Sequence, residues 1–326
     1  MTIDTKILSA LRAAGRNGVA GTELSQRLGI SRAAIWARIE ELRTLGYGIE
    51  ASPHHGYQLL SVPDVLHADD LLSSLGRTKV IGRDIRVFGE TTSTNDVVEK
   101  LARDGVKEGA VVFAEAQTKG RGRLGRKWVS PPRKGLWFSI LLRPPLHPLA
   151  VTQLTIAAAT ALFRAVRSQT GLTPEIKWPN DILIRGKKTA GILTELSAEP
   201  DKVKYVILGM GISVNLVTGD FPPELRRLAT SLRIETSQRQ NRAELAVRIL
   251  QELDRDYDRV CAGQFEALAD EWEEHCTTIG HRVAIQVGGR RIQGTAESLD
   301  TDGALLLRTQ HGHLERIIGG DVTVEK

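Results

Sequence analysis

The segment DILIRGKKTAGILTEL (181–196) contains two strand-like runs separated only by the turn Arg185-Gly186-Lys187. A turn this short joins neighbouring antiparallel strands, because a parallel connection needs a crossover of about a dozen residues or more. Other strand-like runs stand at 85–90, 110–117, 135–144, 175–178 and 205–215, and helical patterns stand at 93–104, 150–169 and 242–260, the last with Leu245, Ile249, Leu253 and Tyr257 at helical spacing. We therefore predict an α+β domain over 67–272, in which helices cover a mixed, mostly antiparallel β-sheet.

Residues 1–64 show the pattern of a helix-turn-helix. In TELSQRLGISRAAIWARIEELRTLG (22–46), Thr22 is a candidate N-cap of a short first helix, and Gly29 provides the turn. Ser31 can cap a second helix. The inward positions are Leu24 and Leu28 on the first helix and Ile35, Ile39 and Leu42 on the second. The residues that we expect to face DNA are Ser31, Arg32, Ala33, Trp36 and Arg38.

A wing follows the second helix in this prediction. YGIEASPHHGYQLLS (47–61) contains two short strands around the turn Pro53-His54-His55-Gly56. The alternative is a helical hairpin used for dimerisation, but small residues beside Arg on the exposed face favour close approach to a DNA groove. The segment up to Asp64 carries seven Lys or Arg against six Asp or Glu. Because this charge is nearly balanced, we expect a dimer to supply the missing affinity.

The C-terminal segment, 275–326, has the pattern of a small β-barrel. HRVAIQV (281–287) alternates, with Val283, Ile285 and Val287 on one face, and glycine-containing turns at 288–289, 302–303 and 311–312 separate short strands. No chemistry is evident here, so we interpret the segment as a packing or docking module.

Composition indicates an intracellular globular protein. The chain has 326 residues, 41% of them hydrophobic and 25% charged, with a net charge of +5. Its most apolar run, 150–163, is shorter than the ~20 residues of a membrane span, and the N-terminus lacks the pattern of a secretory signal. Cys261 and Cys276 form neither a CxxC motif nor a disulfide framework. We expect a cytoplasmic protein without a membrane partner.

The stretch QTKGRGRLGRKW (117–128) contains a formal match to the dinucleotide fingerprint G-x-G-x-x-G. That fingerprint requires a helix directly after it, and Pro131 and Pro132 exclude one. The region from Gln117 to Pro174 has no Asp or Glu, and one loop gathers Lys119, Arg121, Arg123, Arg126, Lys127, Arg133 and Lys134. The alternatives are a solvated surface and an anion-binding loop. Interleaved glycines favour the second, because they let backbone N–H groups approach a phosphate.

Taken together, these motifs resemble a known family. The matching segments are SRAAIWARIEEL (31–42), TTSTND (91–96), EAQTKGRGRLGRKW (115–128), KWPNDILI (177–184), KKTAGILTEL (187–196) and LGMGISVN (208–215). The chain resembles the bifunctional biotin protein ligases that double as repressors of biotin genes, over nearly its whole length. The resemblance implies an N-terminal winged helix-turn-helix, a class II synthetase-like central domain and an SH3-like C-terminal barrel.

The resemblance also implies a two-step reaction. Biotin's carboxylate attacks the α-phosphorus of ATP to give biotinyl-5′-AMP, and a lysine of the biotin carboxyl carrier protein then takes the biotinyl group. Since a carboxylate is ionised at pH 7, this step needs no general base, in agreement with the lack of a His–Asp or Cys–His arrangement. ATP with Mg²⁺ is the expected cosubstrate. Operator DNA is the expected second partner, bound by a homodimer that forms when the adenylate orders the glycine-rich loop.

The site residues are carried over from the family by matching motifs. The implied catalytic cations are Lys188, Arg121, Arg123 and Lys177. The implied biotin contacts are Ser93, Thr94, Asn95, Gln117, Arg121, Gly122, Arg123, Lys188 and Gly191. The implied nucleotide contacts are Arg123, Arg126, Trp128, Asn180, Gly209, Gly211, Ile212 and Asn215. Asp181 is the candidate Mg²⁺ ligand, with a turn cap as its alternative role, and Trp128 and Trp178 fit both a core and a ligand-stacking role.

Three positions depart from the family pattern. Ser213 stands where Asn is frequent. The expected adenylate-binding stretch, 216–232, has no Trp, so Phe221 or an aliphatic residue would have to contact adenine. The C-terminus DVTVEK lacks a final Arg that could return to the nucleotide site.

Three alternative functions fit the residues less well. A ligase for a related acid such as lipoate has a similar core, but the GRGRxGRxW motif and the N-terminal winged helix argue against it. A non-catalytic biotin-sensing repressor would not need Lys188, Asp181 and Arg121. Nucleic-acid binding by the loop at 119–134 would call for exposed aromatic residues, and Trp128 alone qualifies.

Overall fold

A computed structural model describes residues 2–53 and 55–325 of the chain. It divides into two compact units. One comprises Met1–Arg77 with Asn241–Val247, and the other comprises Thr78–Gln240 with Arg248–Lys326.

The N-terminal unit is a winged helix-turn-helix, as predicted. Its helices are α1 (Ile3–Ala14), α2 (Gly21–Leu28), α3 (Arg32–Thr44) and α4 (Ala68–Leu75), and its antiparallel wing consists of β1 (Gly48–Ser52) and β2 (Gly56–Ser61). In the predicted turn of the wing, His54 lies outside the described residues. Ile35, Ile39 and Leu42 of α3 are buried together with Leu24 of α2.

The caps of these helices agree with the prediction at two of three positions. The Oγ of Ser31 accepts a hydrogen bond from the Ala34 N–H at 3.1 Å, and Gly29 ends α2 in the left-handed conformation at φ 68°. The prediction that Thr22 caps α2 is wrong, because the helix already begins at Gly21 after the N-cap Ala20. The start is set by Val19, whose N–H donates to the Tyr57 carbonyl at 3.0 Å.

Two helices of this unit, α1 and α4, were not predicted. They are held together by polar contacts. Arg12 forms an ion pair with Asp70, and the Thr5 hydroxyl donates to Asp69 at 2.5 Å. The unit therefore reaches Arg77, beyond the predicted boundary at residue 64.

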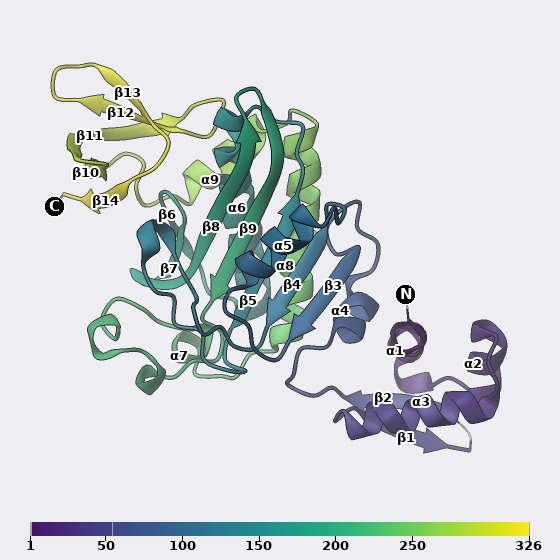
Figure 1. Ribbon diagram of the computed structural model, residues 1–326. Coiled ribbons are helices and arrows are strands. Elements are labelled where there is room, and N and C mark those ends of the chain that lie inside the picture. Colours follow the sequence, from purple (N-terminus) through teal and green to yellow (C-terminus); the bar gives the residue numbers. More distant parts are fainter. Residues whose placement is uncertain (1, 54, 326) are drawn as a thin grey trace. The chain divides into compact units, whose positions relative to one another are not determined.

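The larger unit is built on a seven-stranded sheet in the order β3-β4-β5-β9-β8-β7-β6. The strands are β3 (Asp84–Phe88), β4 (Ala110–Ala114), β5 (Leu136–Leu142), β6 (Glu175–Lys177), β7 (Asp181–Ile184), β8 (Lys187–Glu199) and β9 (Lys202–Ile212). β3 and β4 pair in parallel, and the other neighbours pair antiparallel. This confirms the predicted mixed, mostly antiparallel sheet. The β8–β9 hairpin is its longest element (Figure 1).

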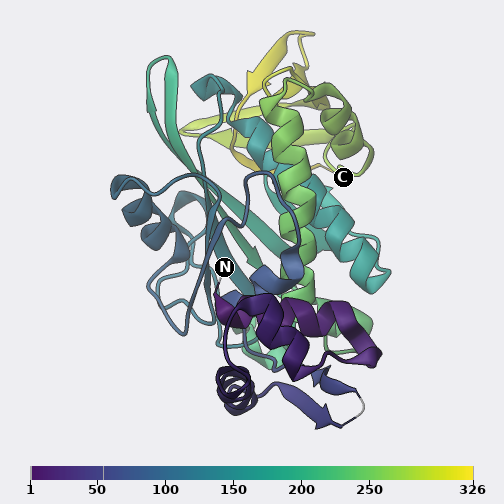
Figure 2. The same cartoon turned by 90° about the vertical axis from the view of Figure 1, so that its right-hand side faces the viewer.

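Helices cover both faces of this sheet. They are α5 (Thr94–Arg103), α6 (Thr152–Thr170), α7 (Leu232–Thr236), α8 (Arg242–Cys261) and α9 (Glu266–Glu274). Figure 2 shows α5 on one side of the sheet and α6 and α8 on the other. The predicted stripe on α8, Leu245, Ile249, Leu253 and Tyr257, is buried. The helix Pro148–Thr170 is long and apolar enough to cross a membrane, but 78% of its most apolar window is buried inside the protein, as in a core helix.

The C-terminal part of the larger unit is a five-stranded antiparallel sheet. Its order is β13-β12-β11-β10-β14, from β10 (Arg282–Val287), β11 (Arg290–Leu299), β12 (Leu305–Thr309), β13 (Leu314–Ile317) and β14 (Asp321–Val324). The predicted strands and turns are confirmed. Val283 and Ile285 are buried, whereas Val287 at the strand end is 38% exposed.

A buried carboxylate on α8 organises the chain that enters β3. The Asp254 side chain is 5% exposed and accepts hydrogen bonds from three consecutive backbone N–H groups, those of Lys79 at 2.7 Å, Val80 at 2.8 Å and Ile81 at 2.8 Å. Buried N–H groups that lose their acceptor carry a desolvation penalty. This one side chain therefore fixes the segment 79–81.

We expect Asp254→Ala to lower the free energy of unfolding by about 3 kcal/mol, because three N–H groups lose their partner at once. Asp258→Ala is the matched control, since Asp258 pairs with the Lys79 side chain on the surface, where both groups are well exposed. That variant should lose less than about 1 kcal/mol. Urea unfolding followed by circular dichroism measures both, and equal losses would contradict this account of Asp254.

Candidate functional site

A cavity of about 680 Å³ opens in the larger unit. Its walls come from the start of α5, the glycine-rich loop (residues 117–134), strands β7, β8 and β9, the segment 216–232 and the start of β14. The predicted residues that line it are Ser93, Thr94, Asn95, Gln117, Arg121, Gly122, Arg123, Arg126, Trp128, Lys177, Asn180, Asp181, Lys188, Gly191, Gly209 and Gly211. The structure thus brings together segments that are far apart in the sequence.

Two predicted nucleotide-binding residues do not line the cavity. Ile212 is fully buried, because it is paired with Leu136 and Ala190 inside the sheet. The Asn215 side chain bonds the Gln240 backbone in both directions, with each contact at 2.9 Å. Asn215 thus connects the end of β9 to the segment before α8. Sequence spacing alone does not reveal this contact.

The turn before α5 forms a buried polar network at one end of the cavity. The Gln117 Oε1 accepts from the Thr94 N–H at 2.9 Å, and the Gln117 Nε2 donates to the Ser130 hydroxyl at 2.9 Å. The hydroxyls of Thr94 and Ser139 lie 2.7 Å apart. The Ser139 hydroxyl also donates to Asn95 Oδ1. Ser139 is fully buried on β5 and was not predicted, because nothing in the sequence around it marks a polar site.

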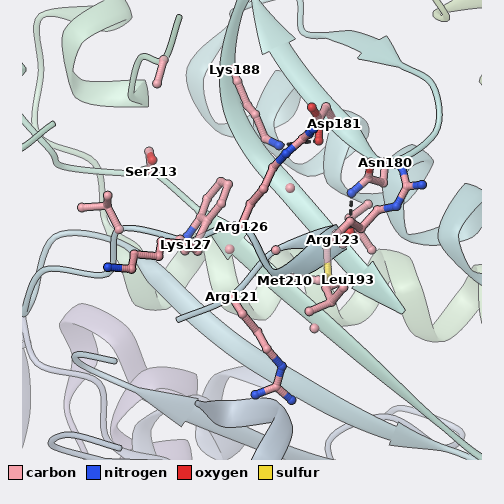
Figure 3. Close-up of a pocket in the computed structure, with 18 of the residues that line it drawn as sticks. Arg121, Arg123, Arg126, Lys127, Asn180, Asp181, Lys188, Leu193, Met210 and Ser213 are labelled. Carbon is pink, nitrogen blue, oxygen red and sulfur yellow. Dashed lines mark hydrogen bonds and ion pairs between the residues drawn. The ribbon is translucent and has the colours of Figure 1, made fainter. Parts of the chain in front are cut away.

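Arg121 is held by two carboxylates. Its Nη1 lies 2.5 Å from Asp96 Oδ1, and its Nε and Nη2 each lie 3.2 Å from Glu195 Oε1. Burial opposes the charge, but these two partners prevail and raise the pKa of the Arg121 guanidinium above its ordinary value. Figure 3 shows the side chain pointing away from Lys188 and Asp181. Arg121 therefore lines the cavity with its stem and keeps its charge at one end.

Lys188 and Asp181 form an ion pair inside the cavity, with Nζ and Oδ1 2.6 Å apart (Figure 3). The Lys188 ammonium also lies over the Trp128 ring, 5.4 Å from its centroid. Among residues 2–53 and 55–325, no group of three or more His, Cys, Asp or Glu is placed to hold a metal ion. Asp181 therefore offers a single carboxylate, and it is already paired.

Two further arginines connect the glycine-rich loop to the C-terminal sheet. Arg123 Nη1 donates to Asn180 Oδ1 at 3.2 Å and to the Gly320 carbonyl at 3.4 Å, and Arg126 forms an ion pair with Asp321. Burial lowers the pKa of Arg123 from its ordinary value. Residues 320–323 line the cavity. The C-terminal segment thus packs against the glycine-rich loop, and folding returns the start of β14 to the cavity, which the sequence did not predict.

The loop itself contains no helix after the G-x-G-x-x-G match. A single 3-10 turn covers Arg123–Gly125, and Leu124 has a positive φ of 55°. This agrees with the rejection of a dinucleotide fold from the sequence. Trp128 and Trp178 both line the cavity. Trp178 is only 2% exposed, and Trp128 packs edge-on against Trp137, with the ring centroids 6.4 Å apart.

Comparison with known proteins agrees with this geometry. Residues 87–213 match the biotin/lipoate A/B protein ligase family, 4–58 match an HTH domain, and 278–324 match the biotin protein ligase C-terminal domain. The bifunctional ligase/repressor BirA of Bacillus spizizenii is 37% identical over 98% of both chains. The chain belongs to the BirA family of bifunctional ligase/repressors.

More distant relatives show the same pattern. BirA of Escherichia coli is 29% identical over 99% of this chain and 97% of its own. A solved structure, the biotin protein ligase from Aquifex aeolicus in complex with biotin and ATP, superposes with a TM-score of 0.64 at 30% identity, covering 75% of this chain and 99% of that one. The larger unit thus has the ligase fold.

In this BirA-family protein, the segment 216–232 closes one side of the cavity. It attaches to β8 through the Lys188 N–H, which donates to the Leu228 carbonyl at 2.8 Å. Phe221, Leu225, Leu228 and Ala229 line the cavity. Phe221 is only 5% exposed, whereas Leu228 is 65% exposed. These residues form an apolar wall in the stretch that lacks the expected Trp. Ser213, another of the three departures, also lines the cavity.

The residues predicted to face DNA lie on α3 of the N-terminal unit and at its N-cap, Ser31. Ser31, Arg32 and Ala33 are exposed at the start of the helix, and Trp36 is 58% exposed. Arg38 differs, because its guanidinium lies 2.5 Å from Glu41 and 3.7 Å from Asp4. Its charge is therefore largely neutralised within the unit.

The glycines of the site serve contacts within the protein, in addition to any contact with a ligand. A Cβ on Gly209 would lie 2.3 Å from Asn95 Oδ1, and one on Gly211 would lie 2.5 Å from Trp128 Nε1. Both glycines lie on β9, where Gly211 pairs with Gly191 of β8 and Gly209 pairs with Leu193 of β8. The backbone there is bare so that Asn95 and Trp128 can pack directly on it.

We expect Gly211→Ala to displace Trp128 and to lower the free energy of unfolding by about 1–3 kcal/mol, the usual range for overpacking. Near-ultraviolet circular dichroism and urea unfolding check the two effects. Gly89→Ala is the control, because its Cβ would meet nothing within 4 Å. An unchanged tryptophan signal in Gly211→Ala would contradict the packing described here.

Proposed function

We propose that the cavity activates biotin with ATP and transfers it to a lysine of a biotin carboxyl carrier protein, and that the N-terminal unit represses biotin genes. The observation that carries the ligase is the Lys188–Asp181 pair, which places an ammonium between the polar pocket at Asn95 and the apolar wall at Leu228. One end of the cavity suits a ureido ring, and the other suits adenine.

The first step joins biotin to AMP. A carboxylate oxygen of biotin attacks the α-phosphorus of ATP, the bond to the β-phosphate oxygen breaks, and pyrophosphate leaves. Negative charge builds on the α-phosphate oxygens, so the residues serve by positioning and by electrostatic stabilisation. Lys188 is the central cation, and Arg123 and Lys177 add positive charge from two other elements.

The second step moves the biotinyl group to the carrier. The neutral amine of the carrier lysine attacks the carbonyl carbon of the mixed anhydride, the bond to the phosphate oxygen breaks, AMP leaves, and the amine loses a proton. The cavity then has to hold the adenylate away from water until the carrier arrives. Ordering of the glycine-rich loop over the adenylate would do this.

We propose that Mg²⁺ is bound mainly by the phosphates of ATP. Mg²⁺ is commonly held by one or two carboxylates together with substrate phosphates. The single carboxylate of Asp181 fits that arrangement, once a phosphate competes for Lys188. Mg²⁺ would neutralise phosphate charge, and Asp181 would help to orient it.

A lipoate ligase is the competing enzyme, since the matching family model includes lipoate ligases. The pocket around Asn95, Thr94 and Gln117 favours biotin, because a dense set of donors and acceptors suits the ureido group, whereas lipoate ends in an apolar dithiolane. A sensor without catalysis would not need a cation at the centre of the cavity.

We expect wild-type protein to exchange labelled pyrophosphate into ATP with biotin and not with lipoate, and Lys188→Ala to lose at least about 100-fold of this rate, as when one transition-state contact is removed. Lys187→Ala is the matched control, because Lys187 is the exposed neighbour on the same strand. Biotin binding without exchange would leave a sensor-repressor, and exchange with lipoate would overturn the choice of substrate.

DNA binding rests on the exposed start of α3. Arg32 is an exposed, positively charged residue among small residues, and Trp36 adds exposed apolar surface for contact with a DNA groove. Because the charge of this segment is nearly balanced, a single copy would bind weakly. We therefore include a cytoplasmic homodimer that forms when the adenylate orders the glycine-rich loop and that places two winged helices on adjacent half-sites.

We expect biotinyl-5′-AMP to shift the wild type from monomer to dimer in sedimentation velocity. Arg32→Ala should dimerise equally well but bind operator DNA about 10–100-fold more weakly in a mobility-shift assay, as for loss of one base contact. Arg27→Ala, an exposed position on α2, is the control. A monomer that persists with the adenylate at concentrations well above those needed for DNA binding would contradict the dimer.

A further inference from the structure

Glu195 lies next to the cavity and contacts two residues that line it, Asn95 and Arg121. It stands on β8, two and four residues beyond Leu193 and Gly191, which line the cavity. Side chains two residues apart on a strand share a face of the sheet. Glu195 therefore points toward the same side as the cavity wall without being part of it.

The Glu195 carboxylate joins two segments that are distant in the sequence. Its Oε2 accepts from Asn95 Nδ2 at 2.7 Å, and its two oxygens each lie 3.2 Å from Arg121 Nη2. Asn95 lies in the first turn of α5, and Arg121 belongs to the glycine-rich loop. One charged group on the rigid β8–β9 hairpin thus holds both sides of the pocket.

The contact with Asn95 determines which way its amide faces. A carboxylate only accepts hydrogen bonds, so the NH₂ group must point to Glu195. The Asn95 Oδ1 then accepts from the Ser139 hydroxyl and packs on the bare backbone of Gly209. Because the single Ser139 hydrogen goes to Asn95, the Thr94 hydroxyl has to donate to Ser139. Glu195 therefore sets the order of donors and acceptors along Asn95, Ser139 and Thr94.

The contact with Arg121 anchors the glycine-rich loop. Glu195 takes the Nε and Nη2 edge of the guanidinium, while Asp96 takes Nη1. Asp96 itself accepts from the Thr92 hydroxyl at 3.2 Å. Because all three of its guanidinium nitrogens are hydrogen-bonded, Arg121 is held in place at the base of the loop. Arg123 and Lys188 are the cations near Asp181.

We propose that Glu195 is a positioning residue of the ligase, which orients the Asn95 amide for biotin and, with Asp96, holds Arg121 as the anchor of the glycine-rich loop. This inference rests on the proposed function. Glu195 acts on the ground-state pocket through Asn95 and Arg121 and has no contact with the reacting phosphate. Its loss therefore affects biotin binding far more than the chemical step.

The test is Glu195→Gln, which keeps the shape but removes the charge. A glutamine can present either its NH₂ or its oxygen to Asn95, so the pocket loses its fixed polarity. We expect the KM for biotin in pyrophosphate exchange, and the biotin Kd by calorimetry, to rise about 10–100-fold, as for loss of a hydrogen bond to a charged group. The kcat at saturating biotin should stay within about twofold.

Two companion variants make the result decisive. Glu199→Gln is the matched control, because Glu199 lies on the same strand and pairs on the surface with Lys204; its KM should equal that of the wild type. Glu195→Asp retains the carboxylate and should give a KM between those of the wild type and Glu195→Gln. This rescue would not occur if side-chain packing alone mattered.

The proposal is overturned if Glu195→Gln behaves like Glu199→Gln, if it loses kcat at unchanged KM, or if Glu195→Asp binds biotin more weakly than Glu195→Gln. Should the wild type bind biotin but catalyse no exchange, the ligase assignment fails, and the Kd series alone still decides the role of Glu195. A wild type that neither binds biotin nor exchanges pyrophosphate would overturn both.

Discussion

The antiparallel pairing of β8 with β9 is the constraint on which the rest of the site depends. Gly191 pairs with Gly211, and Leu193 pairs with Gly209, so a strip of bare backbone crosses the centre of the sheet. Trp128 and Asn95 pack on this strip from two other segments. Register is therefore decisive, because a shift of one residue would turn the glycines to the other face.

Charge is arranged in layers on this scaffold. At one end Arg121 is neutralised by Asp96 and Glu195, and in the middle Lys188 pairs with Asp181. At the far side Arg123 and Arg126 reach the start of β14. An anionic ligand that enters the cavity would compete with Asp181 and Asp321 for these cations.

The two units divide the work between chemistry and recognition. The larger unit builds its site from strands β7, β8 and β9, the loops around them and the start of β14, where burial strengthens each charge interaction. The N-terminal unit carries the winged helix-turn-helix and exposes the start of α3, with Arg32 and Trp36 at its surface.

The sequence alone determined the strand and helix pattern, the winged helix, the mostly antiparallel sheet and most of the cavity wall, because hydrophobic period, turn residues and dense motifs are local signals. It did not reveal α1, which packs into the same core as α2 and α3, or α4, which bonds to α1 through Asp69 and Asp70. It also did not reveal the shared role of Ser139 and Glu195, which stand in ordinary strands. It misplaced Ile212 and Asn215, and it left β14 out of the site. Only the tertiary structure decided these points, since burial and hydrogen-bond partners arise when distant segments meet.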